Sequence, residues 1–259
     1  MELGESRIVN FIFRYISKEM REELEDYVQN TYLEKFYGID TLEQIDILFR
    51  KQKNDNLEQI KESDLLDLRC YTGYHFREIN AILRGNWTYE QNGLLTNQLS
   101  NKYYLLADRI SKIIEKSSAV GVNFITYRGV DIEAFSKYGI STLEQLIYMK
   151  EKYVYEEGFT STSLLEKTSY FGKKLVDGKL CNIEIQYFIP ADWSEGLFLA
   201  ENMSYSPTQY EYLINKSTLS KVMEVLIEQD KNQAIMKMMV IPTKRWAIYY
   251  KNKKYGNKR

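Results

Sequence analysis

The sequence predicts an α+β fold, in which helices come first and a mainly antiparallel sheet follows. In the first 116 residues, apolar side chains recur at spacings of three and four, which is the period of an amphipathic helix. After Gly121, short runs rich in β-branched and aromatic residues take over, as is typical of strands. The two patterns are segregated along the chain. Segregation favours α+β, whereas regular alternation would favour a parallel α/β sheet.

The predicted helices occupy three stretches, residues 8–36, 65–83 and 101–116. The first stretch repeats its apolar residues at helical spacing. These residues are Ile8, Ile12, Ile16, Met20, Leu24, Tyr27 and Val28.

Two similar phrases each predict a further helix start. YGIDTLEQI spans residues 37–45 and YGISTLEQL spans residues 138–146. Each phrase contains a polar residue followed three positions later by glutamate, the pattern of a capping box. The predicted pairs are Asp40 with Glu43 and Ser141 with Glu144. Because the likeness does not extend beyond the phrases, we interpret it as a reused helix start and not as a duplicated domain.

Six short runs in the second half predict the strands. They read VNFITY, GFTSTS, LCNIEIQYF, TQYEYLI, VMEVLIE and AIMKMMVI. In the third run, Ile183, Ile185 and Tyr187 alternate with polar Glu184 and Gln186. Alternation of this kind predicts a strand with one buried face and one polar face.

Composition excludes several classes of protein. With 259 residues, 44% of them hydrophobic and 27% charged, the chain suits one large globular domain or a domain with a helical extension. A net charge of −1 predicts no general attraction to nucleic acid. Cys70 and Cys181 are too few for a disulfide scaffold and have no zinc-site spacing. Glycine-rich dinucleotide and P-loop motifs are absent, as are apolar stretches long enough to span a membrane.

Three short pieces of the strand-rich half carry the chemistry together. They are Arg128 in ITYRG, the triplet Ser161, Thr162 and Ser163 in GFTSTSL, and Gln209 with Glu211 in PTQYEYLI. Taken singly, each has an ordinary structural explanation. Their order, spacing and apolar surroundings resemble the arginine–serine–glutamate class of mono-ADP-ribosyltransferases, in particular the bacterial exotoxins with a Gln-x-Glu motif. The resemblance covers about residues 65–250 and implies a mixed, mainly antiparallel core of two sheets.

The resemblance implies an enzyme that breaks NAD+ and moves ADP-ribose onto a protein. Arg128 would bind the NAD+ diphosphate, for which a guanidinium fork is well suited. Ser161 would orient the catalytic Glu211, while Thr162 and Ser163 would shape the NAD+ cleft. A carboxylate is chemically sensible at position 211, because the transition state of glycosidic cleavage is cationic and a fixed anion stabilises it.

Two flanking segments add further NAD+-binding candidates. YTGYHFREINAILRG resembles a helix of the toxin branch, which implies that Phe76, Asn80 and Arg84 reach NAD+; their i, i+4, i+8 spacing places them on one helical face. SYFGKK resembles the loop beside nicotinamide, with Phe171 as its aromatic residue and Lys174 where arginine is common. The alternatives are a core role for Phe76, a surface role for Arg84 and a solvated turn for the loop.

Gln209 and its surroundings predict the acceptor. Gln209 and Glu211 lie two apart in a predicted strand, so both side chains are expected on one side. Gln-x-Glu resembles the branch that modifies asparagine or glutamine, as the Rho-directed exoenzymes do. Those enzymes have an aromatic residue three positions before the glutamine, where this chain has Ser206. We therefore assign target recognition to Tyr205, one position earlier, together with Gln209.

The sequence thus predicts a toxin or effector that is an NAD+-dependent protein mono-ADP-ribosyltransferase without a metal. Its partner would be a protein substrate such as a Rho-type small GTPase, modified on a side chain other than arginine. An NAD glycohydrolase and a non-catalytic, particle-associated binding protein remain alternatives. The expected organisation is a helical extension at 1–60, a catalytic domain at 61–250 and a basic, solvated tail at 251–259.

The N-terminus does not read as a signal peptide, because charged residues interrupt its apolar run at once. We expect the protein to act in a cytosol after export by a non-classical or partner-dependent route. The resemblance implies that a separate component delivers it.

Overall fold

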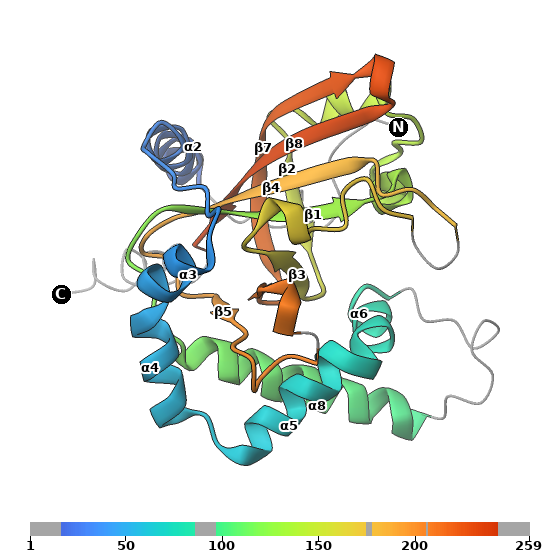
Figure 1. Ribbon diagram of the computed structural model, residues 1–259. Helices are drawn as coiled ribbons and strands as arrows, with labels where there is room; N and C mark the ends of the chain where they lie inside the picture. The colour runs from blue at the N-terminus through green and yellow to red at the C-terminus, as the bar shows by residue number, and fades with distance from the viewer. Residues whose placement is uncertain (1–16, 86–96, 175–177, 206, 243–259) are drawn as a thin grey trace.

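A twisted eight-stranded sheet forms the framework, and helices α4, α5, α6 and α8 gather at one end of it (Figure 1). The computed structural model describes residues 17–85, 97–174, 178–205 and 207–242. The longer helices are α2 (Lys18–Tyr32), α3 (Leu42–Leu48), α4 (Arg50–Gln59), α5 (Glu62–Cys70), α6 (Phe76–Leu83) and α8 (Asn97–Lys116). Shorter helical turns are η1 (Tyr71–His75, π-helical), η2 (Ile132–Tyr138), η3 (Glu144–Met149), η4 (Glu166–Thr168), η5 (Pro207–Gln209) and η6 (Gln229–Lys231). The strands are β1 (Phe124–Val130), β2 (Tyr153–Glu156), β3 (Thr160–Ser163), β4 (Ile183–Ile189), β5 (Gly196–Phe198), β6 (Glu211–Ile214), β7 (Thr218–Glu228) and β8 (Gln233–Ile241).

The strand order confirms the predicted fold class. The sheet runs β2-β7-β8-β4-β1-β3-β6-β5. The pairing of β4 with β8 is parallel, and the other pairings between these strands are antiparallel. The sheet is therefore mixed and mainly antiparallel, as expected for an α+β fold with its helices first.

Two parts of this sheet meet at a narrow joint. A five-stranded part from β2 to β1 and a three-stranded part of β3, β6 and β5 are connected where Tyr127 of β1 pairs with Ser163 of β3 (Figure 1). The expectation of two separate sheets is not confirmed, because this residue pair links the two parts into one sheet.

Helix α2 lies within the helix predicted over 8–36 and spans Lys18–Tyr32. It begins after Ser17, whose hydroxyl accepts a hydrogen bond from the Met20 amide at 3.3 Å. Leu24 and Val28 are buried against β7 and β8, in the same core as Met239. The predicted helical residues Ile8, Ile12 and Ile16 lie outside the described residues.

Both predicted capping boxes are wrong by one residue. At the start of α3, Thr41 accepts from the Gln44 amide at 3.2 Å, and the Gln44 side chain accepts from the Thr41 amide at 3.0 Å. In the second phrase, the Gln145 side chain accepts from the Ser141 amide at 2.8 Å. In both places a glutamine side chain, and not the predicted glutamate, accepts the returning hydrogen bond. In the first phrase the residue that caps the helix is Thr41, whose backbone is extended.

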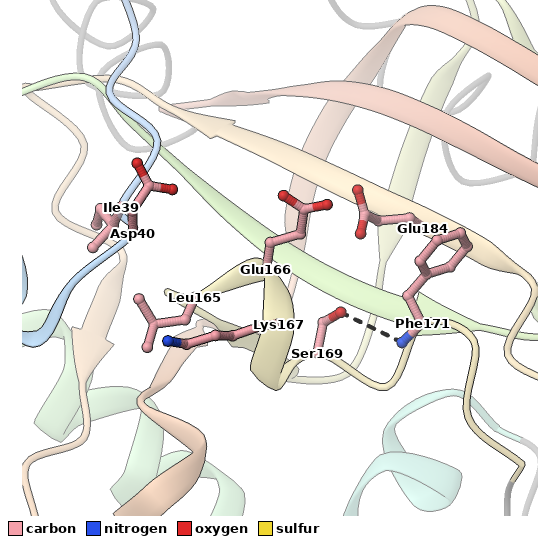
Figure 2. A pocket seen from close by; sticks show the side chains of 8 residues that line it. All are labelled: Ile39, Asp40, Leu165, Glu166, Lys167, Ser169, Phe171 and Glu184. Atoms are coloured by element: carbon pink, nitrogen blue, oxygen red, sulfur yellow. Dashed lines mark hydrogen bonds between the residues drawn. The ribbon is translucent and has the colours of Figure 1, made fainter.

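Strand β4 departs from its predicted two-sided pattern. Ile183 and Ile185 are buried as expected, but Glu184 on the other face is only 1% exposed. The polar face is covered because residues 37–41 and 165–171 fold over it, and an open cavity of about 320 Å³ lies between them (Figure 2).

The segment before residue 60 shares a core with the strands. Ile39, Ile45 and Phe49 pack with Phe124 of β1 and Tyr212 of β6. The boundary at residue 60 between an extension and a catalytic domain therefore stays a prediction, and the tail at 251–259 lies outside the described residues. Within the ranges that are described, no helix has the length and apolar character of a membrane span.

Candidate active site

Arg128 lies in the middle of the framework, on β1 opposite Ile185 of β4. Its guanidinium interacts electrostatically with Glu211 and with Tyr71. Among the described residues it has no side-chain hydrogen bond or ion pair. Its donors are therefore available for an anionic group such as a phosphate.

Glu211 is the first residue of β6 and is only 7% exposed. The Ser161 hydroxyl of β3 is hydrogen-bonded to its carboxyl group. Burial raises the pKa of Glu211 to about 7, although the Ser161 hydrogen bond and the Arg128 charge both lower it. The carboxyl group therefore changes charge close to neutral pH.

A chain of hydrogen bonds leads from α6 to this carboxyl group. The Asn80 amide donates to the Tyr71 hydroxyl at 3.1 Å, and Tyr71 is in turn hydrogen-bonded to Ser161. Burial, followed by the charge of Glu211, raises the pKa of Tyr71 to about 12, so its hydroxyl keeps its proton. The Tyr71 oxygen accepts from Asn80, and Ser161 lies between that hydroxyl and Glu211 and is hydrogen-bonded to both. The chain fixes the orientation of the carboxyl group.

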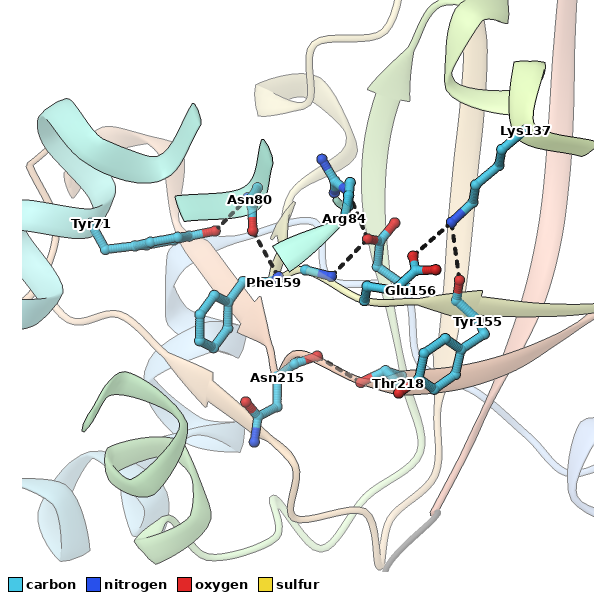
Figure 3. A network of polar contacts seen from close by, with 11 residues as sticks. Tyr71, Asn80, Arg84, Lys137, Tyr155, Glu156, Phe159, Asn215 and Thr218 are labelled. Carbon is cyan, nitrogen blue, oxygen red and sulfur yellow. Dashed lines mark hydrogen bonds and ion pairs between the residues drawn. The ribbon is translucent and has the colours of Figure 1, made fainter. Parts of the chain in front are cut away.

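Asn80 is itself held from the other side. Its side-chain oxygen accepts from the Phe159 amide at 2.9 Å, immediately before β3 (Figure 3). The neighbouring Gly158 leaves room for this contact, because a Cβ atom there would lie 2.7 Å from the Asn80 oxygen. Asn80 thus connects helix α6 to the strand that carries Ser161.

Tyr71 is a site residue that the sequence reasoning missed. In a regular α-helix, side chains nine positions apart point to opposite sides, which separates Tyr71 from Asn80. The π-helical turn Tyr71–His75 holds extra residues and brings the two side chains together. The glycine at position 73 is the sequence signal that could have raised doubt about a regular helix.

Arg84, predicted to reach NAD+, is engaged by a partner within the protein. Its Nε atom donates to Glu156 at 2.8 Å, and the Gly158 amide donates to the same carboxylate oxygen at 3.0 Å (Figure 3). Burial opposes ionisation of Glu156, yet the Arg84 charge and hydrogen bond hold its pKa below the ordinary value. Phe76, on the same helix, is 39% exposed and lies under the Arg77 guanidinium.

The hydroxyls of Thr162 and Ser163 bind main-chain carbonyls. Thr162 donates to the Tyr212 carbonyl at 2.8 Å, and Ser163 to the Gln209 carbonyl at 3.0 Å. Ser163 also contacts Thr168 of η4. These two residues therefore brace the strands and the loop that carry Glu211 and Gln209.

The predicted strand geometry of Gln209 is wrong. Gln209 ends the helical turn η5, and Tyr210 adopts a left-handed backbone with φ of 47° before β6 begins at Glu211. Strand alternation therefore does not relate the two side chains. The loop places Gln209 instead, because its side-chain amide donates to the Tyr170 hydroxyl at 3.2 Å.

Tyr205 lies on the surface beside the π-helical turn. It is 57% exposed and meets Tyr74 edge to face, with ring centroids 5.3 Å apart. Its amide donates to the Thr72 hydroxyl at 3.0 Å. Tyr74, which the sequence reasoning missed, doubles the exposed aromatic surface at this point. Ser206 lies outside the described residues.

Phe171 and Lys174 belong to the loop after η4. The Phe171 amide donates to the Ser169 hydroxyl at 3.4 Å, and its ring lines the cavity of Figure 2. Lys174 is exposed and pairs through its main chain with Leu180. The structure places neither residue in the hydrogen-bond chain that ends at Glu211.

Replacing Gly129 by alanine is expected to destabilise the fold, because the Phe171 loop packs directly on this glycine. A Cβ atom at 129 would lie 2.1 Å from the Phe171 nitrogen. Overpacking of this kind costs roughly 1–3 kcal/mol. Thermal unfolding followed by circular dichroism measures the loss. Gly38→Ala is the control, since its added Cβ would make an ordinary 3.5 Å contact with Tyr127; equal stability of the two variants would contradict the prediction.

The part of the chain that the structure describes contains no group of three or more His, Cys, Asp or Glu side chains that could hold a metal ion. The arrangement instead offers a cationic donor set at Arg128 and a buried acid at Glu211. Such a pair suits a substrate that has a diphosphate and develops positive charge when it reacts.

Solved structures share this fold at low sequence identity. The structure of C3stau2 from S. aureus with NAD matches with a TM-score of 0.63 and 17% identity, over 80% of this chain and 99% of that one. The Clostridium limosum C3 exoenzyme matches with a TM-score of 0.63 and 21% identity, over 81% and 99% of the two chains. Plx2a, an ADP-ribosyltransferase toxin from Paenibacillus larvae, matches with 0.61 and 18%, over 80% and 100%.

A comparison with curated protein sequences gives no match. Residues 48–242, by contrast, match the family described as ADP-ribosyltransferase exoenzyme, and this range includes every strand of the sheet. The chain therefore belongs to the ADP-ribosyltransferase exoenzyme family and is an NAD+-dependent ADP-ribosyltransferase.

Proposed function

We propose that this enzyme is a toxin or effector that transfers ADP-ribose from NAD+ to an asparagine or glutamine side chain of a target protein. The observation that carries the proposal is the placement of Glu211. It is a buried carboxyl group at the end of a hydrogen-bond chain, near the guanidinium of Arg128, which has no side-chain partner among the described residues.

In this proposal, Arg128 binds the diphosphate and Glu211 acts on the ribose next to nicotinamide. Cleavage breaks the bond between the ribose anomeric carbon and the nicotinamide nitrogen, and the electron pair leaves with nicotinamide. The ribose becomes cationic, and ionised Glu211 stabilises that charge. Ser161 supports this role, because its hydrogen bond favours the ionised carboxylate.

The proposed acceptor rests on Gln209. Tyr170 accepts from its side-chain amide, so the side-chain oxygen remains available to accept from the amide group of an incoming asparagine or glutamine. After attack by the acceptor nitrogen on the anomeric carbon, that nitrogen loses a proton, for which Glu211 is the proposed base. A Rho-type GTPase is the target class that the Gln-x-Glu motif supports, and Tyr205 with Tyr74 is the proposed contact surface.

Gln209→Ala is expected to abolish labelling of the target protein while nicotinamide release continues. The reason is that Gln209 is proposed to hold the acceptor and not NAD+. Labelled NAD+ and a cell lysate measure transfer, and chromatography measures free nicotinamide. Gln229→Ala, in the distant turn η6, is the control. Loss of both products in the Gln209 variant would contradict the separate role.

The same assay tests the function as a whole. Label on a lysate protein, located by mass spectrometry on asparagine or glutamine, supports the proposal, whereas label on arginine refutes this use of Gln209. Nicotinamide release without any labelled protein would identify an NAD glycohydrolase, in which water replaces the acceptor.

A further inference from the structure

An open cavity lies on the face of β1 and β4 that residues 37–41 and 165–171 cover. Its volume is about 320 Å³. One part of the lining is apolar and the other acidic. The apolar side chains are Ile39, Leu165 and Phe171, and the acidic ones are Asp40, Glu166 and Glu184 (Figure 2). Arg128, Ser161 and Glu211 do not line it, so it is separate from the proposed bond-cleaving site.

Glu184 is the unusual member of this lining. It is 1% exposed, and its Oε1 atom accepts from the Gln186 side chain at 2.7 Å. Its Oε2 atom is buried and has no hydrogen-bond partner within the described ranges. Buried carboxylate oxygens are nearly always paired, because leaving one unpaired is costly. An acid in this position points to a ligand that supplies the missing donor.

The other two acids converge on the same space. Besides burial, the charges of Glu166, Glu184 and Asp40 raise the pKa of the Tyr127 hydroxyl to about 12, so all three carboxylates lie within electrostatic range of this one group. Lys167 also lines the cavity, but its side chain points away from Glu166 and Glu184 (Figure 2). The cavity is therefore strongly acidic.

The size and chemistry of the cavity narrow the class of ligand. Its volume is at the low end of the roughly 300–1,000 Å³ that is typical of small-molecule sites, so it suits a single side chain better than a dinucleotide. The three carboxylates are not among any described group able to hold a metal ion. An organic cation on an aliphatic stem matches both halves of the lining, and the Phe171 ring adds a cation–π surface.

We propose that this cavity binds a lysine or arginine side chain of the protein substrate, with its cationic head at Glu184 and its stem against Ile39 and Leu165. The inference rests on the proposed transfer to a protein. It names a second contact on that protein, a basic residue near the modified side chain.

The loop that walls the cavity connects it to the acceptor position. Thr168 of η4 is hydrogen-bonded to the Gln209 carbonyl at 3.3 Å, and the next residues lead to Tyr170, which holds the Gln209 side chain. Glu166 and Phe171 at either end of the same segment line the cavity. A protein that covers Gln209 is therefore expected to contact the loop that walls the cavity.

Binding is expected to strengthen with rising pH. Burial and the neighbouring Glu166 raise the pKa of Glu184 despite the Gln186 hydrogen bond, so a proton competes with the bound cation for this carboxylate. Asp40, Tyr127 and Lys167 are the other charged or titratable groups that face it.

The binding test uses Nα-acetyl-arginine amide and Nα-acetyl-lysine amide on the full chain, with Nα-acetyl-norleucine amide as the uncharged match. NMR titration is expected to show saturable binding of a basic amide only. Glu184→Gln and Glu166→Gln should each weaken it by about tenfold, as expected for loss of one charged hydrogen bond. Glu228→Gln, at the distant end of β7, should leave it unchanged. Saturable binding of the uncharged amide, no binding of either basic amide, or displacement by nicotinamide would overturn the proposal.

A second measurement separates this inference from the proposed function. Glu184→Gln removes a buried carboxyl group that is costly to ionise, so thermal stability should be retained or raised and nicotinamide release unchanged. Labelling of the lysate protein should fall. Normal labelling by this variant would overturn the substrate contact. If the wild type nevertheless binds the free amides or putrescine, the cavity takes a free cation instead. If the wild type releases no nicotinamide from NAD+, that result counts against the proposed function and not against the cavity.

Discussion

Glu211→Gln is expected to reduce nicotinamide release by at least about a hundredfold, because a neutral amide cannot stabilise the cationic ribose as a fixed carboxylate does. Loss of a single well-placed electrostatic group in other active sites costs on the order of 10²–10³ in rate. The variant keeps the shape of the side chain, so NAD+ affinity should change little. Release of nicotinamide from NAD+ under saturating conditions measures the effect.

The pH dependence of stability and activity, compared between the wild type and Glu211→Gln, is the control for this prediction. The pKa of Glu211 in the folded chain is about 7, above the ordinary value of 4.5, so the folded state holds the proton more tightly than the unfolded state. The free energy of unfolding should therefore fall as pH rises from about 4.5 to about 7, by an amount on the order of 3 kcal/mol. Glu211→Gln should lack this contribution. Wild-type activity should rise over the same pH range, since the ionised form is the active one. Wild-type rates in the glutamine variant would refute the catalytic role.

Arg128 is expected to give the second largest effect, on NAD+ affinity. Arg128→Gln should weaken binding by about 10- to 100-fold, the equivalent of a charged hydrogen-bond pair with phosphate. Arg128→Lys should fall in between, because lysine keeps the charge but loses the planar fork. Isothermal titration calorimetry with NAD+ measures the dissociation constants.

Arg50→Gln, on the exposed surface of α4, is the matched control for Arg128 and should bind NAD+ as the wild type does. Because Arg128 has no side-chain hydrogen bond or ion pair within the described part of the chain, its replacement is expected to leave thermal stability nearly unchanged. A large loss of stability in Arg128→Gln would indicate a structural role and contradict the prediction.

Much of the fold could be predicted from periodicity, because helices and strands are separate along this chain. The six predicted strands all occur, while β2 and β5 were missed. With three residues, β5 is too short for a period to show. The central grouping of Arg128, Ser161 and Glu211 was also predictable, since the resemblance fixed their order. Their catalytic roles stay predictions.

The remaining site residues depend on irregular backbone that a periodic pattern does not contain. Tyr71 reaches Asn80 through a π-helical turn. Gln209 is separated from Glu211 by the left-handed Tyr210, a conformation that costs a bulky residue roughly 1–3 kcal/mol. Glu184 is buried because two distant loops fold over a strand face that alternation alone would expose. Each of these outcomes is set by tertiary contacts and not by local sequence.

The narrow joint between β1 and β3 gives the active site a mechanical property. Arg128 belongs to one part of the sheet, and Ser161 with Glu211 to the other, so the two halves of the proposed NAD+ site lie on parts whose strands pair only at Tyr127 and Ser163. A dinucleotide that contacts both halves would hold the two parts together across this joint. Amide hydrogen exchange along β3 should therefore slow when NAD+ is bound, and the enzyme should be stiffest when its substrate is in place.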